Sequence, residues 1–312
     1  MPEVKESSEL TTPGEHSGKV LDTVGAVDVI ECEGCGFAHI TPIPSDKELS
    51  EIYKEEYYTE EKPQFIDCVK EDLEWWNSVY NDRYDFLESV LSSGRRRILD
   101  IGCGPGYFLK RGVERGWNCS GVEPSRTAAE HAQGLGLDVK NAMLAEAALA
   151  ESTFDAIHCS EVMEHIPDPL SFLTRAAALL KPDGIICCVA PNDYNPVQEI
   201  LRDKLGYKPY WLAPPHHINY FTPDTLAGVL KNAGFGVVSR TAMFPMDFFL
   251  LMGDNYVGDD TVGRACHARR KKLDLLLGES KLKGFKKELY ELMARHNVGR
   301  EIVIYAQKED RR

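Results

Sequence analysis

Two adjacent histidines, His216 and His217, lie in PPHHINYFTP between a proline turn and a helix start. Imidazole can take a proton from a reacting group or bind a divalent cation, so the pair could be catalytic, metal-binding or an ordinary part of a loop. Neighbours in an extended segment point to opposite sides, so we expect one ring to face a ligand site and the other to pack in the loop. His217 is our choice for the site, because it shares a side with Asn219.

A second group of reactive side chains lies upstream in EVMEH, residues 161–165. If this segment forms one helical turn, Glu161, Glu164 and His165 share a face, because they are spaced i, i+3 and i+4. They could then converge with one distant histidine. Further candidates for a general base are Asn192, Asp193 and Tyr220.

A fold that alternates strands and helices must position these residues. The apolar runs RRILDIG, NCSGVEP, DAIHCS and GIICCVAP have strand length and are separated by amphipathic segments. This pattern predicts an α/β fold with a parallel sheet and right-handed crossovers. Asp168-Pro169 and Thr222-Pro223 each predict a helix start, and Gly234 a helix end. PPHHINYFT follows the fourth of these runs, so we expect it at the edge where the carboxyl ends of strands open toward ligands.

The chain is predicted to divide into five regions. A helix from Glu71 to Leu91 should lead into the main domain, and another should begin after a Ser45 cap. The regions are a disordered leader at 1–18, a small N-terminal appendage at 19–60, the core at 61–245, a helical insertion or substrate cap at 246–297, and the last core strand and tail at 298–312.

Composition limits the class of protein. The 312 residues are 43% hydrophobic, which supports a real core, and 49 acidic against 36 basic side chains give a net charge of -13. This charge argues against nonspecific binding to nucleic acid or anionic membranes. The nine cysteines form no regular framework, and no run resembles a signal peptide or a membrane span. We therefore expect a soluble cytoplasmic protein.

The segment ILDIGCGPGYF, residues 98–108, predicts a ligand-binding loop. It joins a buried strand with an acidic end to Gly102, Gly104 and Gly106, and glycine permits tight turns and close approach of a ligand to the backbone. A dinucleotide fingerprint needs a small residue where Tyr107 lies, so NAD or FAD is disfavoured. A P-loop is excluded, because no lysine followed by serine or threonine is present.

This loop resembles motif I of class I S-adenosylmethionine-dependent methyltransferases, L-D-x-G-C-G-x-G. SGVEPS ends the next strand in Glu123, 17 residues after Gly106, where the family places an acidic residue on the ribose. FDAIHCSEVMEHIPDP is similar to the family's fourth strand and the loop after it. The resemblance covers about residues 70–308 and implies a Rossmann-like fold with a seven-stranded, mostly parallel sheet and helices on both faces. The alternative is another doubly wound protein with a glycine-rich loop.

The resemblance also implies which residues bind S-adenosylmethionine. The three glycines would pass close to its methionine portion, Asp100 would orient its amino group, and Glu123 would hold the ribose. The implied cofactor-binding residues are Asp100, Gly102, Cys103, Gly104, Gly106, Glu123, Pro124, Met143, Leu144, Ser160 and Glu161.

The implied activity is methyl transfer to oxygen or carbon of a small molecule. The candidate catalytic residues are His217, His216, His165 and Tyr220. Ubiquinone-type and small-RNA 2′-O-methyltransferases carry a similar E-x-x-E-H, so a divalent metal at Glu161, Glu164, His165 and His217 is one interpretation; a structural role for these residues is the other. Metal-assisted RNA 2′-O-methylation and a noncatalytic cofactor-binding subunit remain as alternatives.

Two additions to the core carry their own signals. CEGCG resembles the N-terminal region of bacterial methyltransferases that hold zinc with two cysteine pairs. Here Cys32 and Cys35 are the only C-x-x-C, and His16 and His39 are distant possible ligands, so a complete tetrahedral set is not evident and we expect a degenerate ribbon without metal. Residues 264–296 hold ten basic against four acidic side chains, which indicates a solvated helix face or a site for a phosphate-bearing substrate. The preceding apolar segment, FPMDFFLLMGDNYVGD, is expected at the substrate or at a homo-oligomer contact.

Overall fold

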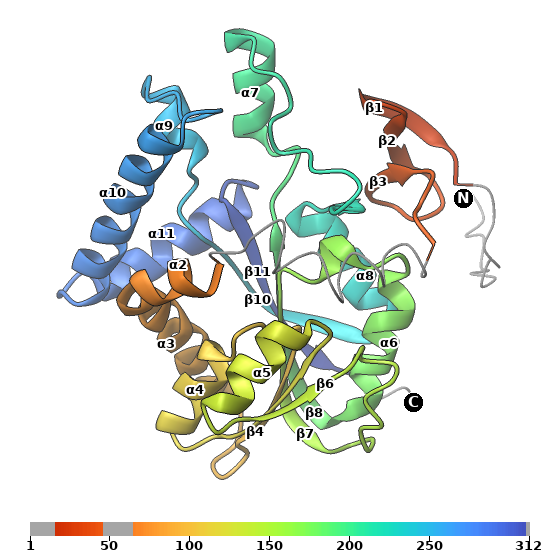
Figure 1. Cartoon of the computed structure of the whole chain (residues 1–312), viewed down its shortest axis with the longest axis vertical. Helices are drawn as coiled ribbons and strands as arrows, with labels where there is room; N and C mark the ends of the chain where they lie inside the picture. Colours follow the sequence, from red (N-terminus) through yellow and green to blue (C-terminus); the bar gives the residue numbers. More distant parts are fainter. Residues whose placement is uncertain (1–15, 46–64, 310–312) are drawn as a thin grey trace, which may run out of the picture.

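The computed structural model describes residues 16–45 and 65–309 of the chain. The N-terminal strands at residues 18–41 and helix α10 (Asp260–Gly278) lie on opposite sides of a core built around one sheet (Figure 1). No helix in these two described stretches has both the length and the apolar character needed to cross a bilayer.

The central sheet has seven strands in the order β10-β11-β8-β7-β4-β5-β6. The five strands from β8 to β6 are parallel, and β11 runs antiparallel to both β8 and β10. This mostly parallel order confirms the predicted fold class. The strands are β4 (Arg97–Ile101), β5 (Asn118–Glu123), β6 (Asp138–Asn141), β7 (Phe154–Ser160), β8 (Leu180–Pro191), β10 (Phe235–Ala242) and β11 (Glu301–Lys308).

Helices cover both faces of this sheet, because successive strand residues point to opposite sides. In β4, Ile98 packs in a cluster with Leu87 and Phe108, whereas Leu99 packs in a second cluster with Leu173 and Leu226. The helices of the first face are α3 (Leu73–Val90), α4 (Tyr107–Glu114) and α5 (Arg126–Gly134), and those of the second are α6 (Pro169–Leu179) and α8 (Pro223–Asn232).

The predicted helix caps are present. The side chain of Asp168 accepts a hydrogen bond from the backbone amide of Ser171, and that of Thr222 accepts one from Thr225. Each cap satisfies an amide at the start of its helix that has no partner within the helix. After α8, Gly234 adopts a φ of +89°, which lets the chain leave the helix into β10.

A second, antiparallel sheet joins the N-terminal region to the core. It has the order β1-β2-β3-β9, with β1 (Gly18–Val24), β2 (Val27–Cys32), β3 (Ala38–Thr41) and β9 (Asn219–Tyr220). Strand β9 follows the histidine pair, so the appendage is anchored beside that segment. The predicted leader is described only at residues 16–18, of which Gly18 already belongs to β1, and the helix expected after Ser45 lies outside the described residues.

Between β10 and β11 the chain forms α9 (Asp247–Leu251), α10 (Asp260–Gly278) and α11 (Lys283–Arg295). Helix α10 packs on α3, where the indole nitrogen of Trp75 donates a hydrogen bond to Asp274 at 2.8 Å. The apolar segment before α10 contributes Leu250, which packs against Leu201. The remaining helices of the described residues are α2 (Phe65–Glu71), the 3₁₀-helix η2 (Met163–His165) and α7 (Pro196–Leu205).

Candidate active site

A cavity of about 1020 Å³ lies over the carboxyl ends of β4, β5 and β7. Small-molecule sites span roughly 300–1,000 Å³, so this one can hold a cofactor together with an acceptor. All but one of the residues predicted to bind the cofactor line it. They are Asp100, Gly102, Cys103, Gly104, Glu123, Pro124, Met143, Leu144, Ser160 and Glu161.

The glycine loop requires its glycines for two different reasons. Gly102 has a φ of +69°, and a Cβ there would lie 2.5 Å from a methyl of Val162, so a side chain would be both strained and obstructed. Gly106, the exception, is not among the cavity-lining residues. It is the N-cap residue just before α4, with a φ of +86°, and a Cβ there would lie 2.8 Å from that of Ala132. Its absent side chain lets α4 and α5 approach each other.

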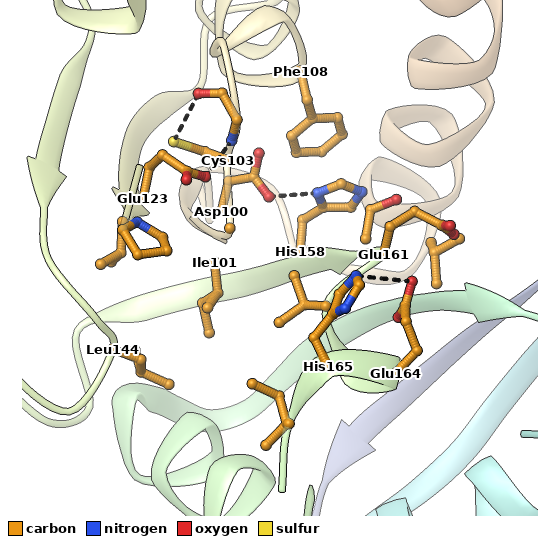
Figure 2. Close-up of a pocket in the computed structure, with 18 of the residues that line it drawn as sticks. Asp100, Ile101, Cys103, Phe108, Glu123, Leu144, His158, Glu161, Glu164 and His165 are labelled. Carbon is orange, nitrogen blue, oxygen red and sulfur yellow. Dashed lines mark hydrogen bonds and ion pairs between the residues drawn. The ribbon is translucent and has the colours of Figure 1, made fainter. Parts of the chain in front are cut away.

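Asp100 is held by a partner that the sequence analysis did not identify. His158, on the neighbouring strand β7, lies with Nδ1 2.6 Å from Oδ1 of Asp100 (Figure 2). Its Nε2 lies 2.8 Å from Nη1 of Arg83. Because a guanidinium only donates, Nε2 must accept, which places the imidazole proton on Nδ1. Burial lowers the pKa of His158 and favours this neutral form. Phe108 stacks on the ring at 3.7 Å and fixes its plane.

The carboxylate of Glu123 supports the loop that it faces. Its two oxygens accept hydrogen bonds at 2.8 Å from the backbone amides of Gly104 and Ser125. Burial raises the pKa of Glu123 to about 7, because these two bonds only partly offset the loss of solvation. An additional hydroxyl donor, such as a ribose, would favour its ionised form.

The EVMEH segment does not form the helical turn considered from the sequence. Glu161 takes a left-handed φ of +55°, and the 3₁₀-helix begins only at Met163. Glu161 lines the cavity but does not belong to the close group that contains Glu164 and His165. Glu164, His165 and His217 instead come together, with one ligand atom of each within 4.8 Å of the others.

His165 is oriented by the segment that carries the histidine pair. Its Nδ1 lies 2.7 Å from the carbonyl oxygen of His216, so Nδ1 donates and Nε2 can accept a proton. Nε2 lies 3.8 Å from Oε1 of Glu164, and the ring of His217 approaches edge-on, with its centroid 5.1 Å away. Glu164 and His165 lie across the site from Glu123 and Leu144, with Asp100 and His158 between (Figure 2).

Glu164 is a buried carboxylate, with 1% of its surface exposed. In the described part of the chain neither of its oxygens accepts a hydrogen bond. Burial, followed by the charge of Glu161, raises the pKa of Glu164 well above its ordinary value. This carboxyl can hold a proton or be stabilised by a nearby cation.

Of the other candidate bases, all but His217 lie away from the cavity wall. His217 lines the cavity and its neighbour His216 does not. Tyr220 lies on β9 in the small apolar cluster formed with the appendage, and Asn192 donates to the carbonyls of Asn297 and Gly299. Neither of these two, nor Asp193, is among the lining residues.

Arg270, on α10, reaches the cavity from the basic insertion. It is 7% exposed, and its guanidinium lies 4.6 Å from the ring of Trp75. Its Nε has no hydrogen-bond partner among the described residues, and burial lowers its pKa. Trp76 and Tyr80, which stack on each other, also line the cavity, so aromatic walls accompany this cation.

A mostly parallel seven-stranded sheet with antiparallel β11, and a cavity above the loop at Gly102 and Gly104, are the features of a class I S-adenosylmethionine-dependent methyltransferase. A sequence model of the methyltransferase domain family matches residues 17–240. The chain belongs to this family, which confirms the enzyme class and the cofactor expected from the sequence.

The chain is similar to individual proteins in sequence and in structure. The ubiquinone biosynthesis O-methyltransferase of Cereibacter sphaeroides is 32% identical over 155 residues, 47% of this chain and 63% of the relative. That of Actinobacillus pleuropneumoniae is 36% identical over 102 residues, 29% of this chain and 44% of the relative. The chain thus spans less than two thirds of the length of these relatives. A solved S-adenosylmethionine-dependent methyltransferase from Archaeoglobus fulgidus aligns with 74% of this chain and 93% of its own, at 21% identity and a TM-score of 0.49.

Proposed function

We propose that this enzyme methylates a hydroxyl oxygen of a small acceptor that carries an anionic group. The observation that carries the proposal is the composition of the cavity. The glycine loop forms one side, Glu164, His165 and His217 form another, and Arg270 reaches the same space. The ubiquinone biosynthesis O-methyltransferases among the relatives support oxygen over carbon as the acceptor atom.

S-adenosylmethionine would supply an electrophilic methyl group on a sulfonium centre. We assign its ribose to Glu123 and its amino group to Asp100, because carboxylates accept hydrogen bonds from hydroxyls and attract cations. The backbone at Gly102 and Gly104 allows close approach of the methionine portion. Met143 and Leu144 provide an apolar surface for the adenine.

His165 is the proposed general base, with His217 as its neighbour in the site. A neutral His165 with its proton on Nδ1 presents Nε2, which can take the proton of an acceptor hydroxyl as its oxygen attacks. The imidazolium formed would be stabilised by Glu164, whose oxygen lies 3.8 Å from Nε2. In the described regions neither oxygen of this buried carboxyl accepts a hydrogen bond, so a positive charge on His165 would stabilise its ionised form.

Arg270 is the proposed binding group for the anion of the acceptor. A buried guanidinium is costly unless its donors are used, and a carboxylate or phosphate can accept two of them at once. Trp76 and Tyr80 favour an acceptor with an aromatic or other flat apolar body. RNA is not our proposed acceptor, because the chain carries a net charge of -13.

The proposal can be tested with labelled methyl donor and two acceptors. Protocatechuate and catechol share the aromatic diol, and only protocatechuate carries a carboxylate. We expect methyl transfer to both and a lower KM for protocatechuate. Calorimetry should also detect binding of S-adenosylhomocysteine. Binding of this product without transfer to either diol would contradict methylation of such hydroxyls.

Metal-assisted activation of the hydroxyl is the second candidate. It is favoured by the ligand atoms of Glu164, His165 and His217, which all lie within 4.8 Å of one another. A divalent cation there would lower the pKa of a bound hydroxyl and would neutralise the buried carboxylate. Turnover that is abolished by a chelator and restored by Mg²⁺ or Mn²⁺ would support this candidate. Turnover indifferent to chelator would leave His165 as the base.

A further inference from the structure

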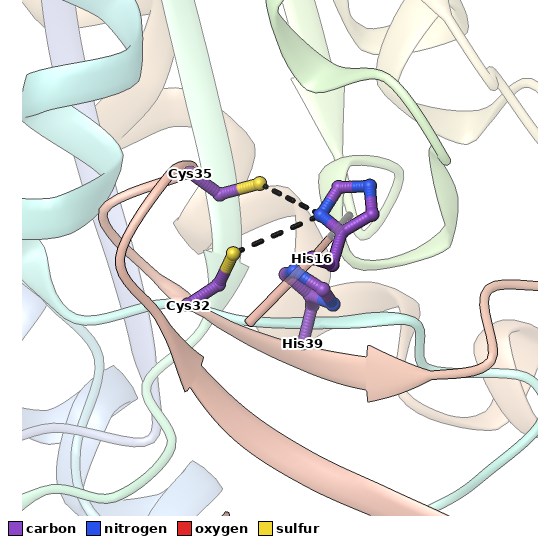
Figure 3. A group of neighbouring side chains, drawn as sticks. All are labelled: His16, Cys32, Cys35 and His39. Atoms are coloured by element: carbon purple, nitrogen blue, oxygen red, sulfur yellow. Dashed lines mark hydrogen bonds between the residues drawn. The ribbon is translucent and has the colours of Figure 1, made fainter. Parts of the chain in front are cut away.

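Four side chains of the kinds that can bind a metal lie close together in the N-terminal sheet, far in sequence from the core site. His16 precedes β1, Cys32 ends β2, Cys35 follows in the turn, and His39 lies on β3 (Figure 3). One ligand atom from each lies within 4.8 Å of the other three. The fold thus supplies two histidines beside the cysteine pair.

The spacing of these atoms fits a single metal ion. Nδ1 of His16 lies 3.7 Å from Sγ of Cys32 and 3.4 Å from Sγ of Cys35. A tetrahedral zinc ion with bonds of ~2.3 Å to sulfur and ~2.0 Å to nitrogen separates such ligands by about 3.5 Å. The three atoms therefore already lie at nearly the separation that zinc would impose.

His39 provides an independent observation. Its Nδ1 donates a hydrogen bond to the carbonyl oxygen of Ile40 at 2.8 Å, which leaves a lone pair on Nε2. The side chain is 1% exposed, and Nε2 has no hydrogen-bond partner in the described part of the chain. A ligating histidine commonly donates its other ring proton to a carbonyl in this way. A buried acceptor without a donor is otherwise unfavourable.

The turn between the cysteines directs both sulfurs to one side. The amide of Gly36 donates to the carbonyl of Cys32 at 2.9 Å, and Gly36 takes a φ of +73°, which favours glycine. The amide of Cys32 in turn donates to the carbonyl of Phe37. A tight loop of this kind places a C-x-x-C pair around one metal.

We propose that His16, Cys32, Cys35 and His39 bind a structural Zn²⁺ ion. Two thiolates and two neutral imidazoles balance its charge and complete a tetrahedral set, so no position is left for a substrate or water. Such a site stabilises the fold and takes no part in methyl transfer. The proposal replaces the metal-free ribbon expected from the sequence.

The ion would also stabilise the active-site segment. The amide of Ile40, next to His39, donates to the carbonyl of Ile218 at 2.9 Å, and the amide of Ile218 donates to the carbonyl of Glu164 at 2.7 Å. Two hydrogen bonds therefore connect the strand of His39 to Glu164. Removal of zinc should loosen residues 218–220 before it affects β4.

Elemental analysis of the full-length protein, purified under reducing conditions and dialysed against zinc, tests the proposal. We expect one zinc per chain, and Co²⁺ exchanged into the site should show thiolate charge-transfer and tetrahedral visible absorption bands. His16→Ala, an exposed change, should lower zinc affinity by more than about 100-fold. Cys68→Ser and His296→Ala are matched controls outside the cluster and should retain the metal.

Three results would overturn the proposal. The first is wild-type protein that binds no stoichiometric zinc or cobalt. The second is an intramolecular disulfide between Cys32 and Cys35 in protein that has been kept reduced. The third is equal zinc affinity for His16→Ala and the His296→Ala control. Hydrogen exchange gives a readout independent of activity, since chelation should raise exchange at residues 218–220 more than in β4.

Discussion

Nδ1 of His158 donates a hydrogen bond to Oδ1 of Asp100 across the pair of strands β7 and β4, at 2.6 Å. Arg83 donates to the other ring nitrogen from α3, so three elements fix the carboxylate that we assign to the amino group of the cofactor. Both residues of the pair are buried, and burial lowers the pKa of His158, which favours its neutral form.

Replacing His158 should weaken cofactor binding. His158→Leu removes the donor to Asp100, and a hydrogen bond to a charged group is worth about 1.5–3 kcal/mol, or roughly 10- to 100-fold in affinity. Calorimetry with S-adenosylhomocysteine measures this loss. His158→Asn retains a donor near the Nδ1 position and should recover part of the affinity. Equal affinities for wild type and His158→Leu would remove Asp100 from the cofactor site.

Cofactor affinity should depend on pH through Glu123. Burial raises its pKa to about 7, and the ionised form is the better acceptor for ribose hydroxyls. Affinity should therefore be full above pH 7 and should fall by about tenfold per unit below it. Calorimetry with S-adenosylhomocysteine between pH 5.5 and 8.5, about 1.5 units on either side of that pKa, would reveal the trend. Glu123→Gln should bind more weakly and lose the pH dependence, and a dependence that survives this change would assign the titration to another group.

Asparagine variants of His165, His216 and His217 should differ in their effect on kcat. His165→Asn should lower kcat by roughly 10²- to 10⁴-fold, the usual contribution of a general base, with little change in S-adenosylhomocysteine binding. His217→Asn should also lower kcat, because His217 lines the cavity beside His165. His216→Asn should have a much smaller effect, since His216 is not among the cavity-lining residues and the change keeps the backbone carbonyl that contacts His165. A loss in His216→Asn equal to that in His217→Asn would contradict this assignment.

Arg270 should determine preference among acceptors. Arg270→Met should raise the KM for protocatechuate by roughly 10- to 100-fold, as expected for loss of a charged hydrogen bond, and leave catechol almost unchanged. Arg269→Met, an exposed neighbour on α10, is the control. The melting temperature of Arg270→Met should match or exceed that of wild type, because no described residue pairs with its Nε. Equal effects on both acceptors would indicate a packing role.

The parts of the site formed by contiguous residues could be predicted from the sequence. The glycine loop, the end of β5 at Glu123 and the caps at Asp168 and Thr222 depend on local patterns, which the structure reproduces. The choice of His217 over His216 for the ligand site assumed an extended segment, whereas residues 214–216 form a turn; His217 nevertheless lines the cavity. Tyr220, although near in sequence, faces the appendage because β9 pairs with β3.

The residues that the sequence analysis missed are brought in by packing between distant elements. In the sequence, Arg83 and Arg270 are ordinary polar positions on predicted helices. The packing of α3 and α10 beside the cavity places both side chains in its lining. One feature of the sequence could have indicated His158, because it is a basic residue inside a mostly apolar strand. His16 and His39 were only distant possible ligands in the sequence, because the strand pairings β1–β2 and β2–β3 that bring them to Cys32 are not visible in it.

The pairing of β3 with β9 has a consequence for the order of folding. It joins His39 to Asn219, 180 positions later in the chain. During synthesis the N-terminal strands leave the ribosome early, but their outer edge is covered only after most of the core has been made. Because contacts of such long sequence separation form late, the newly made hairpin should expose an open strand edge for much of translation, a stage at which it could recruit a chaperone or pair wrongly.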